Sequence, residues 1–209
     1  MTTTKTHTVH LAVYDTLADW ETGYAAAFLN RPWWRPTDWP WQVRTVAETT
    51  DPITTLGGIR IIPDLALADL DPSGSAMLIL PGANHWDAGG GAPFTAAARA
   101  FLAAGVPVAA ICGATFGLAR DGLLDDRPHT SSALEYLAMS GYRGADHYVD
   151  QPVVTDGDLI TAGPTNPIEF ARAIFERLDL FGDKATDAWY RMFKHSDAAA
   201  FFELTPGAS

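Results

Sequence analysis

Residues 109–115 read Ala-Ala-Ile-Cys-Gly-Ala-Thr, and residues 106–111 before the cysteine form an apolar run. A short apolar run that passes directly into small residues predicts a buried strand followed at once by a helix. The side chain of Cys112 would then stand out from the end of the strand, because Gly113 and Ala114 are small enough to leave it room. This arrangement resembles a nucleophile elbow with cysteine in place of serine. At a helix N-terminus, we expect the pKa of the thiol to be lowered.

Outward from this stretch, strand and helix patterns alternate along the chain. Apolar or β-branched runs predict the strands, and Ala-rich or amphipathic stretches predict the helices between them. The predicted strands cover residues 9–14, 42–47, 76–80 and 106–111, and the predicted helices cover residues 18–30, 94–104, 114–121 and 167–180. Continuous apolar strands separated by helices predict an α/β fold with a mostly parallel sheet covered on both faces, a three-layer αβα sandwich.

Two small β-hairpins are predicted beside these elements, at residues 53–62 and 153–162. Each turns at a dipeptide that accepts positive φ, Gly57-Gly58 in the first and Asp156-Gly157 in the second. The last stretch, residues 184–202, predicts one further helix.

Composition limits the class of protein. No linker or repeat interrupts the chain, so we predict one domain over residues 1–209, with its core at about 9–180. Lys and Arg total 14 against 25 Asp and Glu, a formal charge of -11, which disfavours binding to nucleic acid. No apolar run approaches the roughly 20 residues that cross a bilayer, and no secretion signal is evident. We therefore expect a cytoplasmic protein without a membrane or nucleic-acid partner.

The single cysteine, Cys112, excludes an intramolecular disulfide and a zinc site made of several thiolates. A lone cysteine is commonly a small buried hydrophobe, but the position of this one at an elbow favours a reactive thiol. The histidines outside the motifs lack the spacing of metal ligands; they are His7, His10, His147 and His195. We expect neither a metal nor another cofactor.

Two further motifs follow predicted strands. Leu80-Pro81-Gly82-Ala83-Asn84 forms a turn whose backbone amides could face an oxyanion, although turn chemistry alone would also explain it. His85, next to this turn, is a candidate for the pocket wall. Asp19 and Glu21 open the first predicted helix, where acidic residues favour the helix dipole. A carboxyl near a thiolate would instead share its proton, and Glu21 is the better candidate of the two.

Glu21, the turn at residues 80–82 and the elbow at residues 110–113 together resemble the ThiJ/PfpI superfamily. Residues 156–162 and 169–171 resemble its late hairpin and the helix that follows. The resemblance spans residues 9 to 180, and it implies a flavodoxin-like sandwich that is usually a homodimer.

The resemblance also implies roles for individual residues. Cys112 matches the nucleophile, and Glu21 matches a partly buried glutamate in contact with it. The amides of Ala83 and Gly113 match the oxyanion donors, with Gly82, Asn84 and His85 beside them as candidate substrate-binding residues.

One departure concerns a histidine. Many members carry it after the elbow in a Thr-Thr-His pattern, whereas residues 127–132 here read Arg-Pro-His-Thr-Ser-Ser. Ser132 therefore occupies the usual position, and His129 lies three residues earlier. His129 is kept as a candidate catalytic residue, the alternative being a hydrogen-bonding residue of a loop.

Superfamily members include cysteine peptidases and amidases, glyoxalases or deglycases, isonitrile hydratases, chaperones and oxidative-stress sensors. The leading hypothesis is an enzyme in which the Cys112 thiolate attacks a small electrophilic substrate and Glu21 carries a proton. The alternative is a non-enzymatic oxidative-stress sensor or chaperone that uses the same cysteine. A third possibility is a protein that binds a ligand in the crevice without chemistry.

Overall fold

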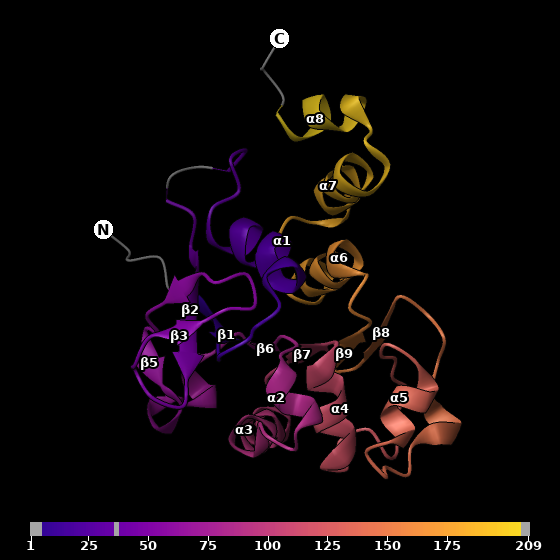
Figure 1. Ribbon diagram of the computed structural model, residues 1–209. Helices are drawn as coiled ribbons and strands as arrows, with labels where there is room; N and C mark the ends of the chain where they lie inside the picture. The colour runs from indigo at the N-terminus through magenta and orange to yellow at the C-terminus, as the bar shows by residue number, and fades with distance from the viewer. Residues whose placement is uncertain (1–5, 36–37, 206–209) are drawn as a thin grey trace.

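The computed structural model describes residues 6–35 and 38–205, and it contains a central seven-stranded sheet (Figure 1). The strand order is β5-β2-β1-β6-β7-β9-β8. The strands are β1 (His7–Ala12), β2 (Trp41–Ala47), β5 (Leu65–Ala66), β6 (Met77–Leu80), β7 (Val108–Ile111), β8 (Val153–Asp156) and β9 (Leu159–Ala162). Every neighbouring pair is parallel except β8 and β9, which are antiparallel. The predicted mostly parallel sheet is confirmed.

Both predicted hairpins form. Strands β3 (Ile53–Thr54) and β4 (Arg60–Ile61) make a separate two-stranded antiparallel sheet, and Gly58 in the turn between them has a φ of 83°. The second hairpin is β8 and β9 themselves, and it completes one edge of the main sheet.

Helices cover both faces of the sheet (Figure 1). One layer contains α1 (Asp19–Asn30), α6 (Pro167–Arg177) and α7 (Asp183–His195), and the other contains α3 (Ala92–Ala103) and α4 (Gly113–Arg120). Shorter helices are α2 (Asn84–Asp87), α5 (Leu134–Ala138) and α8 (Ala198–Leu204), and 3-10 turns lie at Leu67–Asp69, Pro72–Gly74 and Ala145–His147. The predicted three-layer αβα sandwich is therefore confirmed. Within the described ranges, no helix has the length and apolar character needed to cross a membrane.

The apolar strands predicted from the sequence form the centre of the core. Every residue of β6, β7 and β9 is buried, because helices cover both faces and leave neither to water. These central strands end at the same edge of the sheet, where the turn after β6 and the elbow after β7 lie side by side.

The prediction of a single helix over residues 184–202 is wrong, because the segment folds as two helices, α7 and α8. Ser196 has a left-handed backbone with a φ of 56°, which ends α7. The side chain of Asp197 then accepts a hydrogen bond from the amide of Ala199 and caps α8. A capping aspartate stabilises a new helix start, so the chain changes direction here.

Candidate active site

Cys112 lies between the last residue of β7 and the first residue of α4, with a φ of 56° and a ψ of -127°. A non-glycine residue with positive φ is uncommon and strained, and such residues cluster at functional sites. Its backbone is fixed on both sides: the amide donates to Ala162 O at 3.0 Å, and the carbonyl accepts from Thr115 Oγ1 at 2.6 Å. The predicted elbow therefore holds the thiol in one place at the N-terminus of α4.

Glycines allow the surrounding segments to approach the elbow closely. A Cβ on Gly82 would lie 2.9 Å from Cys112 Cβ, 3.0 Å from Cys112 Sγ and 3.0 Å from Glu21 Oε1. A Cβ on Gly113 would lie 3.1 Å from Trp86 Cδ1. The turn after β6 and the elbow after β7 are thus in direct contact, and position 82 has no room for a side chain.

Glu21 reaches this contact from α1. Its side chain is completely buried, and the amide of Gly82 donates to its Oε2 at 2.6 Å. Its other oxygen, Oε1, is also buried and accepts no well-formed hydrogen bond from the described residues. Oε1 and Cys112 Sγ each lie 3.0 Å from the same point above Gly82, and a hydrogen bond between the two side chains contributes to the pKa of both groups, so this oxygen is on the side of the sulfur. Asp19 is directed elsewhere, because its carboxylate accepts from the amide of Gly57 at 2.7 Å.

Burial decides the protonation of this pair. It raises the pKa of Glu21 to about 7, and the hydrogen bond from the Gly82 amide offsets part of the increase. Burial and then the Glu21 carboxylate raise the pKa of Cys112 to about 12, while the Gly113 amide acts in the opposite direction. The expectation that the helix N-terminus lowers the pKa of the thiol is therefore wrong, because desolvation and a nearby negative charge outweigh it. Between about pH 7 and pH 12 the two groups together hold one proton.

The backbone amides near the sulfur differ in whether they already donate a hydrogen bond within the protein. Ala83 has an extended backbone before α2, and no hydrogen bond between described residues uses its amide. The amide of Gly113 forms a hydrogen bond with the sulfur. This bond lowers the pKa of Cys112, against the increase that burial causes. The amide of Asn84, by contrast, already donates to Thr16 Oγ1 at 3.0 Å. Ala83 and Gly113 are therefore the two amides that could serve an oxyanion.

His85 lies on a neighbouring cavity. Its ring packs edge-on against Tyr14 with the ring centroids 4.4 Å apart, and both residues line a cavity of about 360 Å³. Neither Cys112 nor Glu21 belongs to that cavity wall. His85 therefore lies on the wall of a cavity that does not include the thiol.

His129 is completely buried, and both of its ring nitrogens contact other groups. Nδ1 lies 2.8 Å from the carbonyl oxygen of Arg127, and Nε2 lies 3.2 Å from the hydroxyl of Tyr142. The structure therefore does not bring this histidine to Cys112, and its contacts match the alternative of a hydrogen-bonding loop residue. Ser132, at the position of the usual histidine, is exposed.

Two residues near the thiol were missed by sequence reasoning. The hydroxyl of Tyr136 in α5 donates to Asp87 Oδ1 in α2 at 2.5 Å, and the Tyr136 ring lies 5.1 Å from that of Phe116 in α4. The carboxylate of Asp87 also helps to raise the pKa of Cys112, after burial and Glu21. Asp87 follows closely on the turn at residues 80–84, which was the one available signal.

The fold and the site define a class of protein: an αβα sandwich with a buried thiol and carboxyl at a strand-to-helix elbow. The model of the DJ-1/PfpI family matches residues 7–177, and the chain belongs to this family. The resemblance seen in the sequence motifs is confirmed.

The relatives cover from two thirds of the chain to nearly all of it. "Uncharacterized protease YoaZ" from Bacillus subtilis is 38% identical over 203 residues, which are 96% of this chain and 97% of that protein. The crystal structure of a thiJ/pfpI family protein from Bacillus anthracis superimposes with a TM-score of 0.91 at 38% identity and covers 98% of each chain. "Glutathione-independent glyoxalase DJR-1.2" from Caenorhabditis elegans is 26% identical over 140 residues, which are 66% of this chain and 74% of that protein. Enzyme names thus occur among the relatives, and they name different reactions.

Proposed function

We propose that this protein is an enzyme in which the Cys112 thiolate adds to the electrophilic carbon of a small carbonyl compound. The observation that carries the proposal is the buried carboxyl of Glu21, which has a free oxygen on the side of the sulfur and a pKa raised by burial to about 7. A general base works best when its pKa is near the working pH, and this carboxyl meets that condition.

The proposed reaction begins with transfer of the thiol proton to Glu21 Oε1. The sulfur then forms a bond to the carbonyl carbon, and the electron pair of the C=O double bond moves onto the oxygen. The amides of Ala83 and Gly113 donate to this oxygen and stabilise its charge. Glu21 then returns the proton to this oxygen, which gives a hemithioacetal. With an α-oxoaldehyde such as methylglyoxal, Glu21 next moves the proton of the former aldehyde carbon to the neighbouring carbon, and water hydrolyses the resulting thioester to release the hydroxy acid and the free thiol.

The proton count favours an aldehyde over an amide. Addition to an aldehyde expels no leaving group, so one carboxyl can carry the protons that move in turn between the sulfur, the oxygen and the two carbons. Amide cleavage additionally requires protonation of a departing amine, usually by a histidine. His129 is bonded to Arg127 and Tyr142 instead. We therefore place small aldehydes such as methylglyoxal first, the substrate class that the glyoxalase name of the nematode relative suggests.

The experiment compares wild-type protein with Cys112→Ser and with the control Ser132→Ala. Each is incubated with methylglyoxal, short amides and isonitriles. We expect turnover of methylglyoxal by wild type and by the control, since Ser132 is exposed, and none by Cys112→Ser. Turnover that survives in Cys112→Ser, or no turnover of any of these compounds by wild type, would overturn the proposal.

A second candidate is the oxidative-stress sensor or chaperone. The observation in its favour is the same carboxyl, because a protonated Glu21 could donate a hydrogen bond to a sulfinate formed on Cys112. Mass spectrometry after peroxide treatment tests it. Stable gain of two oxygen atoms at Cys112, without turnover of the compounds above, would favour this function over the enzyme.

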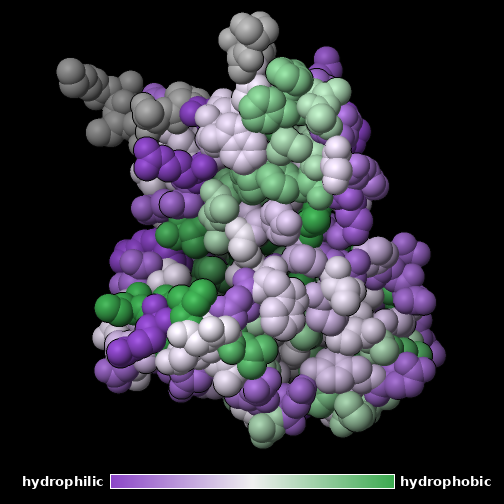
Figure 2. All heavy atoms as spheres, turned by 45° about the horizontal axis from the view of Figure 1, so that its top comes forward, coloured by the Kyte–Doolittle hydropathy of each residue, from purple (hydrophilic) through white to green (hydrophobic). Residues whose placement is uncertain are grey.

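We also propose a homodimer. Large apolar side chains are exposed at the start of α1 and along the β3–β4 hairpin, and Figure 2 shows strongly hydrophobic side chains at the left, the side on which Figure 1 places β3. These side chains are Trp20, Leu56, Ile59 and Ile62. A contiguous exposed apolar area often marks a protein interface. Sedimentation should give a dimer mass for wild type and a monomer mass for Ile62→Asp; a wild-type monomer at high concentration would contradict it.

A further inference from the structure

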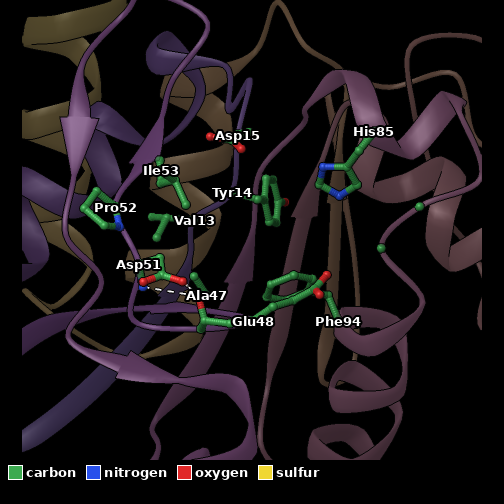
Figure 3. A pocket seen from close by; sticks show the side chains of 13 residues that line it. Val13, Tyr14, Asp15, Ala47, Glu48, Asp51, Pro52, Ile53, His85 and Phe94 are labelled. Carbon is green, nitrogen blue, oxygen red and sulfur yellow. Dashed lines mark hydrogen bonds between the residues drawn. The ribbon is translucent and has the colours of Figure 1, made fainter.

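A cavity separate from the cysteine site opens at the carboxyl ends of β1 and β2, next to α2 and α3 (Figure 3). Its volume of about 360 Å³ falls within the usual range of small-molecule sites, roughly 300 to 1,000 Å³. Tyr14 is the boundary between the two sites: its ring lines the cavity, while its hydroxyl donates to the carbonyl of Pro81 in the turn beside Cys112.

The charged groups of the cavity wall all have one sign. Its carboxylates come from Asp15 after β1 and from Glu48 and Asp51 after β2, and the described wall includes neither lysine nor arginine. Asp15 accepts from the amide of Thr54 at 2.8 Å, and Asp51 accepts from the hydroxyl of Thr49 at 3.1 Å. The carboxylate of Glu48 accepts no hydrogen bond from any described residue. Negative charge is thus available to a ligand, above all at Glu48.

The rest of the wall suits an organic group. The rings of Tyr14 and Phe94 meet edge to face with centroids 5.1 Å apart, and Ile53 lies across from them. Figure 3 shows Glu48 extending to the side of Phe94 in this view, and both residues line the cavity. Aromatic faces beside carboxylates favour cations that carry an apolar part. A metal ion fits less well, because among the residues that the structure describes no three or more His, Cys, Asp or Glu side chains converge to hold one.

His85 lies on the same wall. Its Nε2 is buried and has no hydrogen-bond partner among the described residues. Burial lowers the pKa of His85 and outweighs the Glu48 carboxylate, which raises it; the positive charge of Arg120 contributes in the same direction as burial. The neutral imidazole ring adds no positive charge to the cavity.

We propose that this cavity binds a small organic cation, a primary amine with an apolar group, whose ammonium pairs with Glu48 and whose apolar part packs against Tyr14 and Phe94. Such a ligand satisfies the free carboxylate and the apolar wall at the same time. The site does not depend on the chemistry proposed for Cys112, since the cysteine is outside the cavity wall.

The experiment measures binding of phenethylamine to the full-length protein by calorimetry, with 2-phenylethanol as an uncharged probe of the same shape. We expect saturable binding of the amine and weaker binding of the alcohol. Glu48→Gln should weaken amine binding about tenfold, because it removes one charge-assisted hydrogen bond while keeping the side-chain volume. Glu135→Gln, on the exposed surface of α5, is the matched control and should leave binding unchanged.

A second comparison fixes the location of the ligand. Cys112→Ala should bind phenethylamine as wild type does, whatever its effect on turnover. The proposal is overturned if the amine does not saturate, if the alcohol binds equally well, or if Glu48→Gln and Glu135→Gln behave alike. Loss of amine binding in Cys112→Ala would also overturn it, because the amine would then occupy the cysteine site.

Discussion

Acidic side chains lie on both sides of Tyr14 at the same edge of the sheet, and their surroundings differ. On one side Glu21 is sealed against Cys112, and burial raises its pKa to about 7. On the other side Glu48 and Asp51 line a cavity that is open to solvent. Burial disfavours the charged form of a carboxyl, so Glu21 can carry a proton near neutral pH, whereas Glu48 is the group that we propose to contact a cationic ligand.

A sharper contrast lies within the first turn of α1. Hydrogen bonds, chiefly from Thr55, lower the pKa of Asp19, whereas burial raises that of Glu21 two residues later. Successive helix positions point in different directions, so Asp19 meets the β3–β4 hairpin and Glu21 meets the sulfur. Residue type and helix position are therefore insufficient to assign a catalytic role, and the packing around each carboxyl decides it.

The largest expected effect comes from Glu21→Gln, which keeps the size of the side chain but cannot take the thiol proton. Its kcat/KM with methylglyoxal should fall by about 10² to 10⁴, the usual contribution of a general base. Phenethylamine binding should not change, because Glu21 is outside the cavity wall. Equal turnover in wild type and Glu21→Gln would show that Glu21 does not act as the base for Cys112.

The same substitution should alter the dependence of stability on pH. The pKa of Glu21 is raised from 4.5 to about 7 in the folded protein, so the folded state retains the proton longer than the unfolded state. This contribution to the free energy of unfolding is complete below about pH 4.5 and is lost as the pH rises through about 7, by about 3 kcal/mol.

Urea denaturation at several pH values checks this prediction through the difference between wild type and Glu21→Gln, since other titrating groups cancel. Relative to the variant, wild type should lose stability between about pH 4.5 and 7. A constant difference across that range, or one that grows in favour of wild type, would show that the carboxyl is not desolvated.

A smaller effect is expected from Gly82→Ala, because the new Cβ would press against Cys112 Cβ at 2.9 Å. Overpacking of this kind lowers the free energy of unfolding by about 1 to 3 kcal/mol. Gly23→Ala is the control: it lies in α1 with nothing within 4 Å of its added Cβ, and it should be neutral or stabilising by up to about 1 kcal/mol. Thermal unfolding compares them, and equal stability of the two variants would argue against the tight contact.

Much of the fold could be predicted because its signals are local. The apolar runs of β6, β7 and β9 indicate buried strands, and Cys112 with its small neighbours indicates the elbow. The break between α7 and α8 was missed, since the helical pattern continues across it and only the cap at Asp197 marks it. Short elements such as α2 and β5 have too few residues to show a period.

The site was predictable only in part. Glu21 and Cys112 follow separate strands whose ends meet in a parallel sheet, so their motifs could be found along the chain. The Tyr136–Asp87 hydrogen bond and the cavity beyond Tyr14 combine segments that are distant in sequence and carry no motif. The direction of the thiol pKa was predicted wrongly for the same reason, because burial and the neighbouring carboxylate arise only from packing.

The most direct test of the shared proton is the rate at which iodoacetamide alkylates Cys112 as a function of pH, in wild type and in Glu21→Gln. If the pair loses its first proton at about pH 7, the wild-type rate should rise to a plateau with a midpoint near that pH. In Glu21→Gln the midpoint should disappear, and the rate should rise only with the ionisation of the thiol itself. The same profile in both proteins, or a Cys112 that resists alkylation throughout, would contradict the account.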